Sequence, residues 1–218
     1  MDPTLLGALK TVSKTLGMRP TITFVDDSET SPVMQTYLQR GFGVIGIGES
    51  MLNRIYNNTR YRDEILVGLL AHESAHVLQI QRNCQLAWNG GGLHRGSCFK
   101  NLRPENGSTI GIELMADFMA GWTMARAGIL TTGEFEGFGK DLFERGDFYK
   151  NSRGHHGTPR NRLNFMASGY NFGKDGGELG YYEGEFIRDA GGDDLDFKSL
   201  ETAYLASQAV VVARRNRL

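Results

Sequence analysis

Residues 65–81 read ILVGLLAHESAHVLQIQ, and the interpretation of the whole chain starts from this stretch. Its apolar residues recur at the spacing of one helix face, which predicts a long helix over about residues 61–83. Inside that helix, His72, Glu73 and His76 form an HExxH motif. Residues four positions apart share a helix face with Cβ atoms about 5–6 Å apart. The two imidazoles can therefore reach one metal ion together.

Zinc suits this pair of histidines, because zinc–nitrogen bonds of about 2.0–2.1 Å lie within reach of both rings. The neighbouring Glu73 can direct its carboxylate at a metal-bound water without occupying a coordination position. In a chain of this composition the pattern arises by chance about 0.007 times, even before a helix is required. Two surface histidines on an ordinary helix are the alternative, and a third ligand would count against it.

A catalytic zinc site needs three protein ligands and one open position. The metzincin arrangement would put a glycine and a third histidine where this chain has Gln79 and Arg82. A second helix is predicted over residues 109–127, and it carries Glu113 and Asp117 four positions apart. We expect Glu113 to be the third ligand and Asp117 to accept a ring N–H from a ligating histidine.

An exposed acidic helix face is the alternative interpretation of Glu113 and Asp117. It is disfavoured because this helix is apolar nearly all round, with Ile110, Ile112, Leu114, Met115, Phe118 and Met119 beside the pair. An isolated buried charge is costly, so carboxylates in such a helix are expected to be paired. This pattern favours a buried functional pair.

Together, HESAH at 72–76 and ELMAD at 113–117 resemble the gluzincin pattern of HExxH followed by ExxxD. The chain looks most like the bacterial neutral zinc metallopeptidases and is also similar to M48-type peptidases. The likeness runs from about residue 61 to 175 and includes HVLQ (76–79), ELMADFMAGW (113–122), GEFEGFGKDLFERGDF (133–148), HGTPRNR (156–162) and ASGYNFG (167–173). It implies a zincin-like metallopeptidase domain with zinc on His72, His76 and Glu113, Glu73 as the catalytic base and Asp117 in support.

Two features depart from the bacterial family. Ala75-His76-Val77 stands where that family usually has Gly-His-His, and its common N-terminal membrane-anchoring segment is not expected here. Neither departure removes a ligand. The second leaves a cytoplasmic and an extracytoplasmic location both open.

His156 and Arg162 match a histidine and an arginine that recur six positions apart in both families. An imidazole near the metal can donate to the oxyanion of a tetrahedral intermediate, so His156 is expected to be catalytic. Arg162 is expected to support the site by pairing with a carboxylate, either Asp117 or a substrate group. A loop histidine and a surface arginine are the alternative, and His155 can take the place of His156.

The rest of the pattern predicts an α+β fold in one domain, 1–218, mainly helical with a small N-terminal β-sheet. Asp2 and Pro3 begin a helix that Gly17 ends. Strands are expected at 21–25 and 43–47, and helices at 49–56, 134–144 and 197–215. Glycine gathers in residues 128–192, which predicts loops that form the rim of a cleft.

Composition excludes several classes of protein. The chain has 218 residues and a formal net charge of −1, which disfavours nucleic acid as a partner. No stretch approaches the roughly 18 apolar residues of a membrane span, and the N-terminus lacks a signal-peptide pattern. Cys84 and Cys98 form either a disulfide or two thiols, and a second metal site with His94 is a further alternative.

These observations predict a zinc-dependent metallopeptidase that hydrolyses peptide bonds through a zinc-bound water activated by Glu73. A peptide or protein substrate is expected, and the oligomeric state is left open. The first alternative is a non-catalytic zinc-binding protein that regulates or binds partners on a peptidase fold. A metallohydrolase acting on a non-peptide amide shares the same site and is the second.

Overall fold

Residues at its two ends set the limits of helix α1 (Pro3–Leu16). The Asp2 carboxylate accepts hydrogen bonds from the backbone N–H groups of Thr4 and Leu5, which caps the first turn. Gly17 ends the helix with a φ of 66°, a left-handed conformation that glycine adopts without strain. The buried face of α1 carries Leu5, Ala8, Leu9 and Val12. The predicted first helix is therefore confirmed.

The computed structural model describes residues 2–28, 34–39, 42–57, 60–88, 110–131, 134–135, 137–139 and 158–179. Three short strands form a mixed sheet in the order β1-β3-β2: β1 (Thr21–Val25), β2 (Met34–Gln39) and β3 (Phe42–Gly48). The central strand β3 pairs parallel with β1 and antiparallel with β2. Helix α2 (Glu49–Tyr56) follows β3 directly, with Asp27 accepting hydrogen bonds from the N–H groups of Ser50 and Met51.

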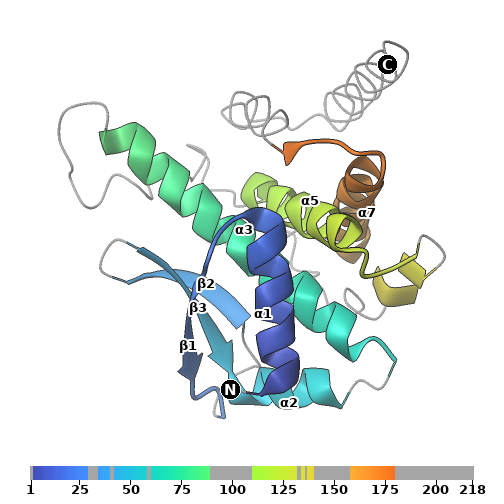
Figure 1. Ribbon diagram of the computed structural model, residues 1–218. Coiled ribbons are helices and arrows are strands. Elements are labelled where there is room, and N and C mark those ends of the chain that lie inside the picture. The colour runs from blue at the N-terminus through green and yellow to red at the C-terminus, as the bar shows by residue number, and fades with distance from the viewer. Residues whose placement is uncertain are drawn as a thin grey trace.

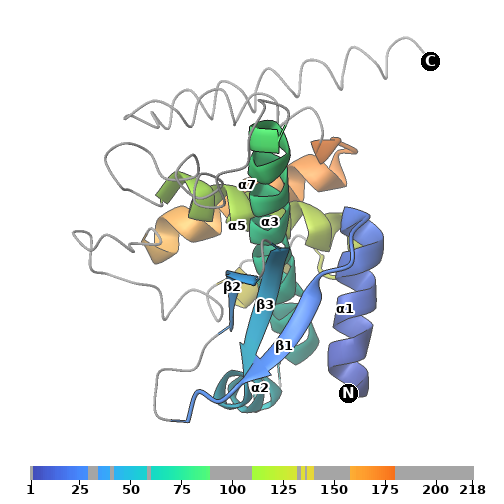
Figure 2. The same ribbon diagram turned by 90° about the vertical axis from the view of Figure 1, so that its left-hand side faces the viewer.

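Helix α3 (Arg62–Trp88) is the central element of the fold (Figure 1). The sheet lies against one side of α3, whereas α5 (Ile110–Ala127) crosses it on another side (Figure 2). The main core joins α1, β3, α3 and part of α5, with Ile45, Leu66, Leu70 and Met124 among its fully buried side chains. Burying these apolar side chains stabilises the arrangement and holds α3 in place. None of the described helices is both long and apolar enough to cross a membrane.

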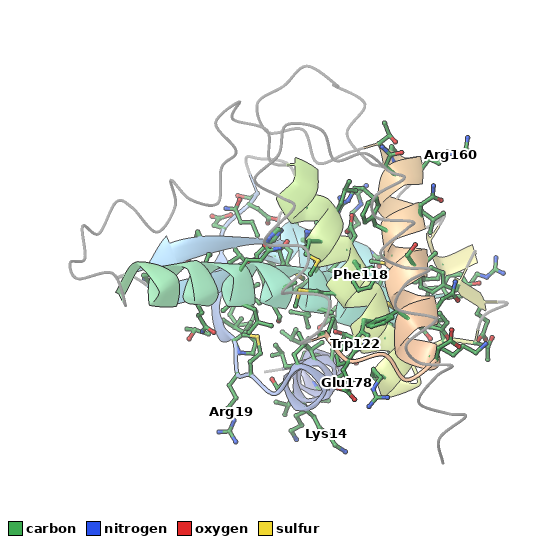
Figure 3. All side chains as sticks on the ribbon, turned by 90° about the horizontal axis from the view of Figure 1, so that it is seen from above. Lys14, Arg19, Phe118, Trp122, Arg160 and Glu178 are labelled. Carbon is green, nitrogen blue, oxygen red and sulfur yellow. The ribbon has the colours of Figure 1, made fainter. Side chains whose placement is uncertain are left out.

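Helix α7 (Pro159–Lys174) packs along α5, as the view from above shows (Figure 3). Phe118 and Trp122 of α5 lie on the side of α5 that faces α7, and Arg160 marks the N-terminal end of α7 in the same view. The two backbones approach closely where glycines meet. A Cβ at Gly169 would lie 1.8 Å from the carbonyl oxygen of Phe118, and a Cβ at Gly121 would lie 1.9 Å from that of Met166. Only glycine fits at these two positions.

The structure confirms the predicted α+β fold, with a small N-terminal sheet and a mostly helical remainder. Helices near 61–83, 109–127 and 49–56 are present, as are strands at 21–25 and 43–47. Strand β2 was not predicted. Its sequence MQTYLQ is half polar, because an edge strand needs an apolar side only where it faces the core.

Two expectations about loops were wrong. The helix predicted over residues 61–83 was expected to end there, but α3 continues to Trp88, because CQLAW contains no glycine or proline and the glycine run starts later, at residue 90. The composition also predicted loops over 128–192, but α7 occupies 16 of these residues. The glycines within α7 allow close packing against α5 and do not form turns. Thr158 accepts a hydrogen bond from the N–H of Asn161 and caps the start of α7.

Several predicted features lie outside the described residues. They include the helix at 197–215, most of the cleft rim at 128–192 and the end of the helix predicted at 134–144, of which residues 134–135 and 137–139 are helical. The side chain of Cys84, together with His94 and Cys98, also lies outside them. These expectations stay predictions.

Candidate metal centre

Helix α3 brings the HExxH residues to the centre of the fold. Ala71 precedes the motif and Ala75 lies within it, and both are fully buried, so their small side chains let neighbouring elements pack close to the helix. His72 and Glu73 are themselves buried at 5 % and 7 % exposure. A surface pair of histidines on an ordinary helix is therefore excluded.

Three side-chain atoms from α3 and α5 meet at one point. Nε2 of His72 lies 3.1 Å from Nε2 of His76 and 3.3 Å from Oε2 of Glu113. The third separation, between Nε2 of His76 and Oε2 of Glu113, is 3.5 Å. We call these three residues the triad. Their burial and mutual distances mean that the triad could hold a metal ion.

Two of the three separations, 3.3 and 3.5 Å, exceed the usual 2.7–3.2 Å of N–H···O hydrogen bonds. All three are also compatible with donor atoms that share one ion. Four donors arranged tetrahedrally at bonds of about 2.05 Å lie about 3.3 Å apart. The observed range of 3.1–3.5 Å encloses this value. The donor atoms of the triad thus fit three corners of a tetrahedron.

Asp117 supports the triad from one turn further along α5. Its fully buried carboxylate lies 2.9 Å from Nδ1 of His72. Arg162 of α7 donates to both oxygens of the same carboxylate, from Nε and from Nη2, at 2.8 Å each. This is the paired, two-bond geometry in which arginine binds a carboxylate most strongly. The predicted pairing of Arg162 with Asp117 is therefore present.

Asp117 and Glu113 set the protonation state of the triad in the metal-free protein. Burial alone would lower the pKa of His72, but the Asp117 charge and hydrogen bond, helped by Glu113, outweigh it and raise that pKa to about 10. Burial would raise the pKa of Glu113, but the hydrogen bond from His72 and the charge on that ring hold it well below its usual range. Without a metal, a positive charge on His72 replaces part of what a cation would supply.

Glu73 occupies an unusual environment for a carboxylate. Its side chain is buried, and Oε2 has no hydrogen-bond partner among the residues that the structure describes. Leaving a buried acceptor unpaired costs about 1–3 kcal/mol, and more when the group is charged. Such a cost is typical of a functional site whose partner is a ligand or a bound water. Thr36 of β2 donates to the backbone oxygen of Glu73 at 2.8 Å, which ties the sheet to this turn of α3.

Of the seven residues predicted for the site, the structure brings five into contact: His72, His76, Glu113, Asp117 and Arg162. The sixth, Glu73, follows His72 on the same helix and is buried. The seventh, His156, and the alternative His155 lie outside the described residues, so their role stays a prediction. Sequence analysis missed two neighbours of the site. Gln79 places Oε1 at 2.8 Å from Nδ1 of His76, and Thr36 holds the backbone of Glu73. The three-residue spacing from His76 to Gln79 was a signal that Gln79 could contact the histidine ring. Nothing in the local sequence indicates the contact of Thr36.

Comparison with known proteins does not add to this picture. No protein-family model, no curated protein and no solved structure matches the chain. The assignment of a function therefore depends on the geometry of the triad and its neighbours.

Proposed function

We propose that this protein is a zinc-dependent peptidase of the gluzincin type. His72, His76 and Glu113 would hold the zinc ion, and Glu73 would act as general base. The observation that carries the proposal is the triad itself, whose donor atoms lie 3.1–3.5 Å apart. Glu73, next to His72 in the motif, has a buried carboxylate oxygen without a described hydrogen-bond partner. The resemblance of HESAH and ELMAD to gluzincin motifs supports the same function.

Zinc is the metal that the motif favours. Two imidazoles and one carboxylate form the ligand set of catalytic zinc in several peptidases, but the same set also holds iron(II) in non-haem oxygenases. HExxH on a helix, with its glutamate placed to act on a metal-bound water, is the zinc pattern of metalloproteases. The match of His72, Glu73 and His76 to this pattern therefore supports zinc.

The charges around the triad support a divalent cation. Among the residues that the structure describes, Glu73, Glu113 and Asp117 contribute three carboxylates around the triad, and Arg162 contributes one guanidinium. Buried charges need partners, because their desolvation is expensive. A divalent ion would supply the two positive charges that the described side chains lack.

Bound zinc would supply a Lewis acid and lower the pKa of a bound water to about 7. The residues of this chain provide the rest of the chemistry. Glu73 Oε2 accepts a proton from the attacking water and then donates it to the nitrogen of the leaving amine. Asp117 and Arg162 hold the ring of His72 in one orientation, so the ligand does not have to reorganise during the reaction. His156 is proposed as the donor to the oxyanion.

A peptide substrate is favoured over a small amide by the position of β2. This strand forms one edge of the described sheet, and Thr36 in its middle hydrogen-bonds to the backbone of Glu73. Edge strands present unpaired N–H and C=O groups that an extended peptide can pair with. A peptide added at this edge would run past the turn of α3 that carries the catalytic motif.

The test of catalysis is Glu73→Gln, with zinc content and cleavage measured on the same preparation. We expect zinc to be retained, because Glu73 is not a ligand, and cleavage of a pool of unstructured peptides, followed by mass spectrometry, to be abolished. Glu64→Gln makes the same change on the same helix away from the triad and should leave cleavage unaltered. Full activity of Glu73→Gln would contradict the mechanism. Zinc binding by wild type without cleavage of any peptide would favour the non-catalytic alternative.

A further inference from the structure

The two histidines of the triad have different hydrogen-bond partners. Nδ1 of His72 lies 2.9 Å from the carboxylate of Asp117, which carries a charge and is itself held by Arg162. Nδ1 of His76 instead lies 2.8 Å from Oε1 of Gln79, three residues along the same helix. One ring is therefore oriented by an ion pair and the other by a neutral amide.

We infer that Gln79 is a positioning residue of the metal centre, which keeps the His76 proton on Nδ1 and leaves the Nε2 lone pair directed into the triad. The inference rests on the proposed metal site but not on the reaction. A carbonyl oxygen accepts and cannot donate, so a hydrogen bond to Gln79 Oε1 requires the proton to be on Nδ1. The ring in this orientation places Nε2 at 3.1 Å from His72 and 3.5 Å from Glu113.

The continuity of α3 is what makes Gln79 available. Residues three apart on a helix lie on the same face, so Gln79 can reach back to the ring of His76 only if the helix continues beyond the motif. It does continue, through the buried Ile80 and on to Trp88. The metzincin pattern has a glycine at the position of Gln79, which has no side chain to offer. In this chain the helix supplies the acceptor from its own next turn.

An amide provides the acceptor without adding charge. The triad already has the carboxylates of Glu73 and Asp117 as neighbours, and one of its own ligands, Glu113, is a third carboxylate. A glutamate at position 79 would keep the hydrogen bond but add a further negative charge beside the buried centre, which draws a cation in more strongly. Loss of the acceptor at position 79 should thus weaken metal binding, whereas a negatively charged acceptor at the same position should strengthen it.

The experiment measures the zinc Kd of the full chain, freed of metal, by competition with a coloured chelator. We expect Gln79→Leu to weaken zinc binding about 10- to 100-fold, the effect typical of losing a partner of a ligating histidine. Gln79→Glu should bind zinc at least as tightly as wild type. Gln81→Leu is the matched control, because Gln81 is exposed on the same helix, and its Kd should equal that of wild type.

A wild-type Kd in Gln79→Leu would overturn the inference. So would a Gln79→Glu variant that loses as much affinity as Gln79→Leu, since it retains the acceptor. A second measurement does not require the leucine variant to fold: in long-range proton–nitrogen spectra of the metal-free wild type, the His76 ring should carry its proton on Nδ1, and a proton on Nε2 would overturn the inference. An unchanged zinc Kd in His76→Ala would contradict the metal centre as well, whereas zinc binding without peptide cleavage contradicts only the peptidase.

Discussion

Replacing Gly169 by alanine tests how far the metal centre depends on the contact between α5 and α7. The added Cβ would lie 1.8 Å from the carbonyl oxygen of Phe118 and 2.7 Å from its carbonyl carbon. Neither atom can move independently, because both belong to the backbone of α5. Non-bonded heavy atoms approach to about 3.2 Å at the closest, so the two helices would have to separate by more than about 1 Å.

This separation has a cost for stability and a cost for the site. Overpacking a close contact destabilises proteins by about 1–3 kcal/mol, and occasionally more. Arg162 lies on the same helix as Gly169, so its 2.8 Å hydrogen bonds to Asp117 would lengthen and leave a buried carboxylate poorly paired. We expect the free energy of unfolding to fall by about 3 kcal/mol and the zinc Kd to rise about tenfold or more.

Urea denaturation of the metal-free protein measures the first effect, and chelator competition measures the second. Gly7→Ala is the control, because Gly7 lies inside α1 with no heavy atom within 4 Å of an added Cβ. The same substitution should there raise the free energy of unfolding by about 0.5–1 kcal/mol. A Gly169→Ala protein as stable as wild type would refute the close-contact argument.

Three further predictions concern the charges at the site. Arg162→Met should lower the free energy of unfolding by about 3–5 kcal/mol, measured by urea denaturation, because it removes the guanidinium that binds both oxygens of the buried Asp117 carboxylate; an unchanged value would contradict a stabilising role for this pair. Removing zinc with a chelator should lower the Tm, and zinc at about 1,000 times its Kd should restore about 4 kcal/mol of stability; a Tm insensitive to zinc would contradict the centre. In the metal-free protein, the pKa of His72 is raised from 6.5 to about 10, so its contribution to stability is complete below pH 6.5 and is lost as pH rises to about 10. Denaturation at a series of pH values checks this, and a stability that rose across that window would contradict it.

The local pattern of the sequence was enough to predict the helices that carry the triad. HESAH and ELMAD lie in apolar segments with helical spacing, and each motif places its functional side chains four positions apart on one face. Such relations depend only on the geometry of a single helix. For that reason the burial of Glu113 and Asp117 could be expected before their partners were known. The structure confirms it for Asp117, whereas the side chain of Glu113 is 12 % exposed and only partly buried.

Helix α7 shows where this reasoning fails. The glycine content of residues 128–192, which include Gly169 and Gly173, predicts loops, since glycine lowers helix propensity. Their use becomes visible only against α5, where Gly169 meets Phe118 and Gly173 meets Trp122 at distances that leave no room for a side chain. Helix propensity describes an isolated segment, and the energy gained by packing two backbones together is not part of it. Strand β2 was missed for a related reason, since its pairing with β3 is a property of two strands.

The sequence by itself determined which side chains are candidates for a metal site, because HExxH and ExxxD set their spacing along two helices. Only the tertiary structure decided that these helices cross with three donor atoms 3.1–3.5 Å apart. It also decided that Arg162 reaches Asp117 from a third helix, and that Thr36 reaches the backbone of Glu73 from the sheet. The physical reason is that local spacing is set by the geometry of one element, whereas contacts between elements are set by how their surfaces pack.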